Sequence, residues 1–234
     1  MARRFLGVVA GALALAGCTV STGPSAPVPT GGAPVAPAPS GPVNFNQIVA
    51  RVEPVAEDMC RRTGGISNCD FNILLDERPG VPSNAYQTVD KSGRPLLIVT
   101  APLLNETRNA DELAFVLGHE AAHHINGHLP KTQNSAVLGA VLAGTIIAAG
   151  GGNAASVEAA QELGAQVGSR AFSKNFELEA DAMGTVIAYR SGYDPVRGAE
   201  FFARIPDPGD RFLGTHPPNA ERQRVVRQVA AQLQ

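Results

Sequence analysis

Two histidines and a glutamate near the middle of the chain have the types and spacing of a metal site that activates water. His119, Glu120 and His123 form the pattern H-E-x-x-H. On an α-helix, residues four apart lie one above the other, so the two imidazoles can converge on one ion. Glu120 points about 100° round the helix axis, where its carboxylate can reach a water beside the ion without binding the ion. The pattern therefore predicts a catalytic metal centre; the alternative is a polar helix face that happens to carry histidines.

An acidic segment downstream offers the third protein ligand that two histidines and a water leave open on a tetrahedral zinc ion. Glu177 and Asp181 are four residues apart and share one helix face, whereas Glu179 is displaced by about 200°. The longer glutamate suits the metal, and the shorter aspartate suits a hydrogen bond to the free ring nitrogen of a ligand histidine. We therefore expect Glu177 to complete a single zinc site and Asp181 to orient a histidine; an exposed acidic helix face is the alternative.

The helix that must hold the histidine pair has recognisable ends. Asn109 is a good N-cap three residues before Glu112, and Gly127 suits the C-terminal end. His124 and His128 are also four residues apart, but they face a different side of this helix from the ligand pair. We expect these two histidines at the surface or behind the ligands, and not in a second metal site.

The remaining patterns indicate an α+β fold. A helix is expected over residues 45–62, in which Pro54 can introduce a kink. Short apolar stretches predict strands at 71–75, 86–89 and 96–100, with a hairpin turn at 91–94 between the last two. A short helix is expected at 103–108, and later helices at 154–171, 175–190, 195–204 and 218–233. A few strands followed by many helices are typical of the α+β class.

One long stretch between the two halves of the metal site is uncharged. No residue from 132 to 157 carries a charge, and residues 137–149 are almost all apolar. A helix that spans a membrane needs about 20 apolar residues, whereas this run is shorter and is broken by Gly139, Gly144 and the glycines at 150–152. We therefore expect a buried helix or a helix that covers part of the surface, with a membrane hairpin as the alternative.

The first 43 residues have the composition of an export signal followed by a tether. Residues 1–17 combine two arginines, an apolar run and small residues, which predicts a secretory signal peptide. The ending Leu-Ala-Gly-Cys resembles the lipobox of bacterial lipoproteins, which implies that Cys18 is lipidated; an ordinary signal peptide is the alternative. Residues 18–43 are uncharged and rich in proline and glycine, so we expect an extended tether before one folded domain over residues 44–234.

In an exported chain, the two cysteines that follow Cys18 can form a disulfide. The net charge of the chain bears on a separate question, whether it binds nucleic acid. Cys60 and Cys69 are expected to form a disulfide, with two buried free thiols as the alternative. The net charge is −2, or −4 without the two arginines of the leader, and the chain has no basic cluster. We therefore set nucleic-acid binding aside.

Taken together, these motifs resemble the HtpX, BepA and CAAX-prenyl-protease family of zinc metallopeptidases, which are gluzincins. The histidine motif followed by Glu177-x-x-x-Asp181 matches the gluzincin pattern. The segment 84–104 and the sequence Thr215-His216-Pro217-Pro218 with Arg222 are similar to two further parts of that family. The resemblance covers about residues 44–233 and is closest to the compact exported members.

The resemblance implies a mainly helical, zincin-like endopeptidase domain with one zinc ion. His119, His123 and Glu177 would hold the ion, and Glu120 would act first as base and then as acid. His216 would either donate a hydrogen bond to the developing oxyanion or occupy the fourth zinc position as a latch; a residue that only begins the last helix is the alternative. An extended substrate would pair with the strand at 96–100 or with its neighbour at Tyr86.

The family resemblance and the N-terminal leader together imply a cellular location and a biological function. We expect a protease of the bacterial cell envelope, anchored through its lipid to the periplasmic face of the outer membrane, that degrades misfolded or unassembled envelope polypeptides. The alternative is a latched zinc protein that acts as an envelope chaperone or assembly factor with little proteolysis. A purely structural zinc lipoprotein is disfavoured, because Glu120 beside the ligand pair would then have no purpose.

Overall fold

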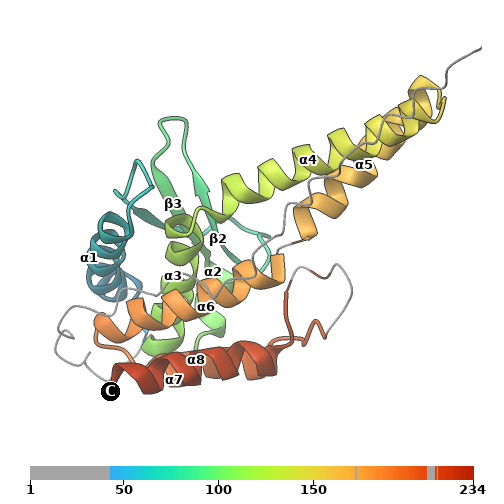
Figure 1. Ribbon diagram of the computed structural model, residues 1–234. Coiled ribbons are helices and arrows are strands. Elements are labelled where there is room, and N and C mark those ends of the chain that lie inside the picture. The colour runs from blue at the N-terminus through green and yellow to red at the C-terminus, as the bar shows by residue number, and fades with distance from the viewer. Residues whose placement is uncertain (1–42, 172, 210–213, 215) are drawn as a thin grey trace, which may run out of the picture.

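The computed structural model describes residues 43–171, 173–209, 214 and 216–234. In these residues a three-stranded sheet and several helices surround the central helix α3 (Ala110–Ile125) (Figure 1). The α+β class expected from the sequence is confirmed. Cys18, the signal peptide and nearly all of the expected tether lie outside the described residues.

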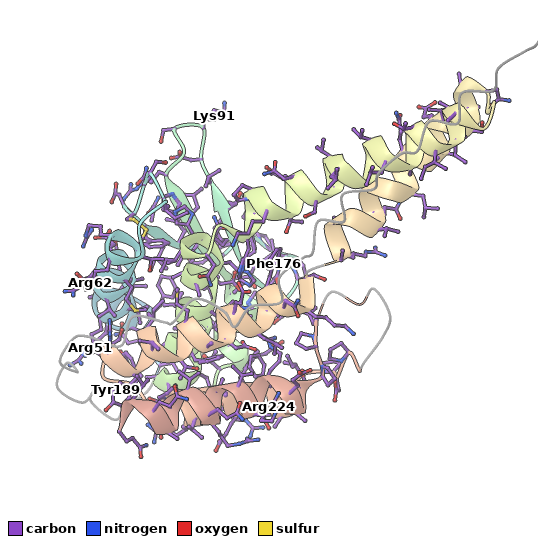
Figure 2. All side chains as sticks on the ribbon, viewed as in Figure 1. Arg51, Arg62, Lys91, Phe176, Tyr189 and Arg224 are labelled. Atoms are coloured by element: carbon purple, nitrogen blue, oxygen red, sulfur yellow. A yellow bond between two sulfur atoms is a disulfide. The ribbon has the colours of Figure 1, made fainter. Side chains whose placement is uncertain are left out.

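The sheet contains β1 (Asn72–Asp76), β2 (Ala85–Val89) and β3 (Pro95–Thr100). Their order is β1-β3-β2, with β1 parallel and β2 antiparallel to β3. The β2–β3 turn, with Lys91 near its tip (Figure 2), is closed by hydrogen bonds to Asp90 from the backbone of Ser92 and Arg94. Because β3 lies between the other two strands, the expectation that residues 96–100 offer an edge to a substrate is wrong. Within the described sheet, β2 keeps an open edge.

Helix α1 (Phe45–Thr63) packs against α3 and is tied to the start of the sheet by a disulfide. Asn44 caps it by accepting a hydrogen bond from the Gln47 backbone. Its buried residues recur at helical spacing, as Ile48, Val52, Ala56 and Met59, and the helix continues through Pro54. Cys60 and Cys69 form the expected disulfide.

Helix α3 follows the short helix α2 (Ala101–Glu106) and lies in the middle of the core. Asn109 caps it by accepting a hydrogen bond from the Glu112 backbone, and Gly127 adopts the left-handed conformation just after its end. Twelve of its residues are buried. Two buried carboxylates, Asp111 and Glu112, form ion pairs with Arg197 and Arg204. These ion pairs join the start of α3 to the C-terminal part of the chain.

Helix α6 (Ser173–Arg190) crosses α3 at very close range. A Cβ atom added to Gly118 would lie 2.9 Å from the backbone oxygen of Gly184, and one added to Gly184 would lie 2.8 Å from the backbone nitrogen of His119. This approach is possible only because both residues lack a side chain. The helix expected over 195–204 is instead a single turn, α7 (Pro195–Gly198), followed by a 3-10 helix, η1 (Ala199–Ala203). Helix α8 (Asn219–Leu233) completes the domain.

Helices α4 (His128–Ala149) and α5 (Ala154–Arg170) form a long hairpin that projects away from the rest of the domain (Figure 1). Of the two placements expected here, a buried helix and a helix that covers part of the surface, the first is wrong, because in α4 only His128 and Gly144 are buried. The glycines within α4 do not break it, because they are where α5 packs. A Cβ atom on Gly139 would lie 2.1 Å from the backbone oxygen of Gly164. By length and composition, α4 is the one helix of the described chain that is able to cross a membrane.

Candidate metal centre

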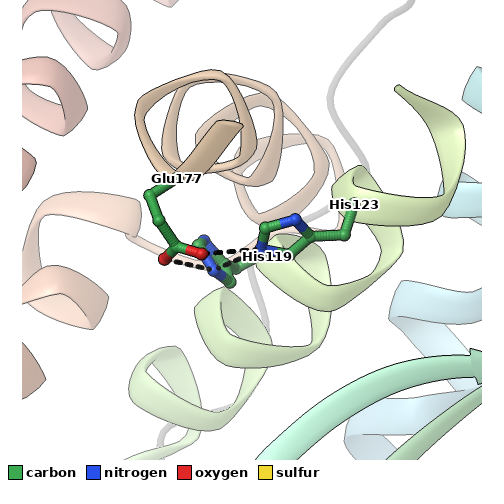
Figure 3. Close-up of side chains that lie close together, drawn as sticks. All are labelled: His119, His123 and Glu177. Atoms are coloured by element: carbon green, nitrogen blue, oxygen red, sulfur yellow. Dashed lines mark hydrogen bonds and ion pairs between the residues drawn. The ribbon is translucent and has the colours of Figure 1, made fainter. Parts of the chain in front are cut away.

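The three expected metal ligands meet where α3 crosses α6. Nε2 of His123 lies 3.0 Å from Nε2 of His119, and the two carboxylate oxygens of Glu177 lie 3.4 and 3.5 Å from these ring nitrogens (Figure 3). A tetrahedral ion with bonds of 2.0–2.1 Å separates neighbouring ligand atoms by about 3.4 Å. The donor set and its spacing therefore fit a small divalent metal ion. The described residues contain this one group of histidine, cysteine or carboxylate side chains that are close enough to hold an ion.

Asp181 and Arg222 fix the ring of His119. Oδ1 of Asp181 lies 2.9 Å from Nδ1 of His119, so the ring donates from Nδ1 and keeps the lone pair of Nε2 for a metal. Arg222 donates to both oxygens of Asp181, at distances of 2.8 and 2.7 Å, and its guanidinium lies over the ring of Phe202. Asp181 is fully buried. The histidine is thus held by a carboxylate that is itself held by a buried arginine.

His128 and Glu179 fix the ring of His123 in the same way. Nδ1 of His123 lies 2.8 Å from Nδ1 of His128. Because Nε2 of His123 faces the other ligands, its Nδ1 carries the hydrogen and donates to His128. The other nitrogen of His128 then donates to Glu179, 3.2 Å away. The buried ring of His128 stacks on Phe176 with 4.4 Å between ring centres, which sets its orientation.

The charges around the ligand cluster favour a cation at its centre. Burial alone would lower the pKa of His119, but hydrogen bonds to Asp181 and Glu177 raise it to about 10. Burial would raise the pKa of Glu177, but hydrogen bonds from His119, His123 and His216 keep it well below its ordinary value. The negative charge of these carboxylates favours a positive charge at the point where the ligand atoms converge. A metal cation can take that place.

A cavity of about 500 Å³ lies in front of the ligand atoms. The half-buried side chain of Glu120 lines it, as do the ligand histidines, Tyr86 and Gln87 of β2, and Leu129 and Thr132 at the base of α4. The open edge of β2 therefore borders the space beside the metal centre. An extended chain in this cavity can pair with that edge while one of its carbonyl groups faces Glu120 and the ligand cluster.

His216 reaches the site although it is more than half exposed. Its Nδ1 lies 3.1 Å from Oε2 of Glu177, and 53% of its side-chain surface is accessible. It lies on a non-helical segment just before α8, as two following prolines require. The ring therefore stands at the mouth of the cavity and contacts a ligand residue.

Sequence reasoning located the ligands and Asp181 but missed part of their support. The sequence marks Arg222 only through its resemblance to a family segment and does not predict its contact with Asp181. Of the two places expected for His128, the surface or behind the ligands, the structure has the second: its ring is buried and contacts His123 from behind. His124 also lies outside the ligand cluster and contacts the Asn68 backbone oxygen. Glu179 is turned about 200° away from Glu177 on the same helix, so it contacts a different histidine, His128.

Comparison with known proteins finds a matching family and similar sequences. The profile of peptidase family M48 matches residues 44–230. The chain is 30% identical over 137 residues to the beta-barrel assembly-enhancing protease of Yersinia pestis, in an alignment that covers 52% of this chain and 28% of that protein. It is 27% identical over 141 residues to the mitochondrial metalloendopeptidase OMA1 of Arabidopsis thaliana, which covers 57% of this chain and 27% of that protein. The alignments thus span less than a third of the length of either relative.

Proposed function

The chain belongs to peptidase family M48, and from this premise we propose that it is a zinc-dependent endopeptidase that acts on misfolded or unassembled polypeptides of the bacterial cell envelope. The observation that carries the proposal is the placing of His119, His123 and Glu177 at tetrahedral spacing beside Glu120 and the open edge of β2. Zinc is the metal for which two histidines and a glutamate with one open position are typical of a catalytic site.

The residues of this chain have distinct roles in peptide hydrolysis. When bound, zinc supplies a Lewis acid that polarises the scissile carbonyl and lowers the pKa of a water. The Glu120 carboxylate removes a proton from the attacking water and then delivers it to the leaving amine. The β2 edge aligns the substrate backbone by pairing with its amide groups. Asp181 and His128 keep the two ligand rings in the tautomer and orientation that hydrolysis requires.

The place of action is proposed from the leader and from one relative. Residues 1–17 predict export, and the lipobox-like ending at Cys18 predicts a lipid anchor on the periplasmic face of the outer membrane. The name of the Yersinia relative connects that protein with beta-barrel assembly. Substrates of this chain would then be unfolded envelope polypeptides, which offer the extended backbone that the β2 edge can bind.

Replacement of Glu120 by glutamine tests the hydrolytic assignment. Glu120→Gln keeps the size of the side chain but cannot accept the proton, so cleavage of an unfolded envelope protein should fall by at least about 10²-fold while one equivalent of zinc remains bound. Metal content and cleavage rate are measured on the same sample, with a chelated wild-type sample as the control for metal dependence. Normal cleavage by Glu120→Gln would show that the assignment is wrong.

The position of His216 favours a second candidate, a latched zinc protein that assists assembly and seldom cuts. Its ring contacts Glu177 at the mouth of the cavity, where it can exclude a substrate. This second function does not depend on the Glu120 carboxylate. The test uses a strain that lacks this protein and has an envelope defect. Full rescue of the defect by Glu120→Gln would support the assembly-factor function, whereas a failure to rescue it supports proteolysis.

A further inference from the structure

The α4–α5 hairpin carries most of the apolar surface that the described chain exposes. Of the eleven large hydrophobic side chains that are exposed among the described residues, eight lie on this hairpin. Six belong to α4, namely Val137, Leu138, Val141, Leu142, Ile146 and Ile147. Their exposed fractions lie between 37% and 69%. The rest of the domain, as far as the structure describes it, does not cover them.

Two common explanations for an apolar helix do not apply to α4. A core helix is buried, whereas only 6% of the most apolar window of α4 is buried. A signal sequence lies near the N-terminus, whereas α4 begins at His128. An apolar helix that is neither buried nor part of a leader requires a partner with an apolar surface.

The composition of the hairpin points to lipid and not to another protein as that partner. Protein interfaces are enriched in aromatic residues, methionine and arginine, and a polar rim surrounds them. Residues 132–157 contain no aromatic residue, no methionine and no charge. An aliphatic surface without directional contacts suits hydrocarbon chains. At about 1.5 Å per residue, the 22 residues of α4 are about 33 Å long.

The polar side of α5 indicates how the hairpin lies on the lipid. Glu158, Glu162 and Gln166 are exposed, recur every four residues and so share one face of α5. Glu162 and Gln166 lie two residues on either side of Gly164, which contacts α4, and are therefore turned about 200° away from α4. A charged side chain is strongly disfavoured at the centre of a bilayer. The hairpin thus has an apolar side on α4 and a polar face on the far side of α5. The two exposed apolar residues of α5, Leu163 and Val167, lie nearer to the contact with α4, one residue before and three residues after Gly164.

We propose that the α4–α5 hairpin lies flat in the surface of a phospholipid bilayer. The apolar outer face of α4 enters the boundary between the headgroups and the acyl chains. The polar face of α5, which carries Glu158, Glu162 and Gln166, points toward water. Leu129 and Thr132 at the base of α4 line the cavity in front of the metal centre, so this contact holds the cavity beside the bilayer. If the proposed protease function is correct, substrates are then taken from the membrane surface. The docking itself does not depend on catalysis.

Single tryptophans provide a position-specific test, because the chain contains none. Val141 lies two residues after Gly139, and Gln166 lies two residues after Gly164, so each is turned about 200° away from the helix contact and the two lie on opposite outer faces of the hairpin. Because α4 and α5 are antiparallel, the two positions are offset by about 6 Å along the hairpin. Val141→Trp, Gln166→Trp and Arg224→Trp, the last on α8, are made in the full-length chain with Cys18→Ala to exclude a covalent lipid. Each is mixed with phosphatidylcholine vesicles whose acyl chains carry bromine, a quencher that acts only at contact.

The three reporters share one N-terminal segment, so any membrane binding by residues 1–42 affects them equally. At a depth of about 5–10 Å, Val141→Trp should shift to shorter wavelength and lose roughly half of its emission, whereas Gln166→Trp and Arg224→Trp should keep theirs. Leu138→Glu, added to Val141→Trp, should abolish the quenching. Unchanged emission of Val141→Trp would overturn the proposal, and equal quenching of Gln166→Trp would overturn the flat orientation. A concentration-dependent shift of Val141→Trp without vesicles would assign the surface to a second copy of this chain instead.

Discussion

At the scale of single residues, the two ligand histidines are supported by hydrogen bonds in different environments. Behind His119, Asp181 and Arg222 form a buried ion pair in which both carboxylate oxygens of Asp181 accept a hydrogen bond from Arg222. Behind His123, the neutral ring of His128 leads to Glu179, whose side chain is 33% exposed. The first arrangement therefore contributes to folding as well as to metal binding, while the second acts mainly on the orientation of its histidine.

Amide substitutions separate these two contributions. Asp181→Asn and Glu179→Gln keep the shape of each side chain but weaken the acceptor, so each should reduce zinc affinity by about 10–100-fold. Only Asp181→Asn should also lower the free energy of unfolding, by about 3–5 kcal/mol, because Arg222 loses the buried carboxylate that accepts its two shortest hydrogen bonds and keeps only a 3.4 Å contact with Glu177. Affinity is measured by competition with a chromophoric chelator, and stability by urea unfolding. Unchanged affinity in Glu179→Gln would remove His128 and Glu179 from the support of the metal centre.

The role of His216 can be decided by the direction in which its loss changes the rate. We expect a latch, so His216→Ala should raise cleavage, by about tenfold if the latched site is open for about a tenth of the time. An oxyanion donor would give the opposite result, a fall of about 10²–10³-fold. The measurement is the cleavage rate on one unfolded substrate at equal zinc content. An unchanged rate would leave His216 as a residue that only begins α8.

Which site residues the sequence could predict follows from how local their contacts are. His119, Glu120 and His123 lie on one helix, and their relative positions follow from helical geometry alone. Glu177 was predictable because two histidines need a third ligand. The contact of His128 with Glu179 joins residues 51 positions apart, and it depends on how α6 crosses α3. No local pattern encodes that crossing.

At the scale of elements, glycines set how closely the helices approach. The sequence suggested that Gly139 and Gly144 interrupt a helix, since glycine has a low helix propensity. The structure shows that Gly139 instead allows α5 to pack against α4, as Gly118 and Gly184 allow α6 to cross α3. The bounds of α1, α3 and the three strands were predictable from caps and apolar periodicity. The packing of helix on helix was not, because a glycine at a contact and a glycine at a break look alike in the sequence.

Two alanine substitutions test whether the α3–α6 crossing sets the geometry of the metal centre. A Cβ atom on Gly184 would lie 2.8 Å from the His119 backbone, so Gly184→Ala should push α6 away from α3 and separate Glu177 from the histidines. We expect a loss of about 1–3 kcal/mol in stability and a clear loss of zinc affinity. Gly139→Ala is the matched control, because its clash lies within the hairpin: it should loosen α4 against α5, seen by hydrogen exchange, and leave zinc affinity unchanged. Equal zinc affinity in both variants would contradict this role of the crossing.

At the scale of the whole molecule, the metal centre exists only in the folded chain. Its ligands come from α3 and α6, and its support reaches α8, so residues more than a hundred positions apart must come together. In an unfolded chain His119 and His123 remain near each other, but Glu177 and Arg222 do not. We therefore expect the proposed zinc ion to bind the folded state far more tightly, so that its binding free energy adds to the stability of the fold.

Removal of the metal should accordingly lower the melting temperature of the full-length chain. At a free zinc concentration of about a thousand times Kd, binding adds about 4 kcal/mol, which for a domain of this size corresponds to about 8–16 °C. Melting is followed by circular dichroism with zinc and with a chelator. His119→Ala is the control: it lacks a ligand, so its melting temperature should be nearly the same under both conditions. A shift in His119→Ala as large as that of the wild type would mean that zinc stabilises the chain from another site, and the assignment of the centre to α3 and α6 would fail.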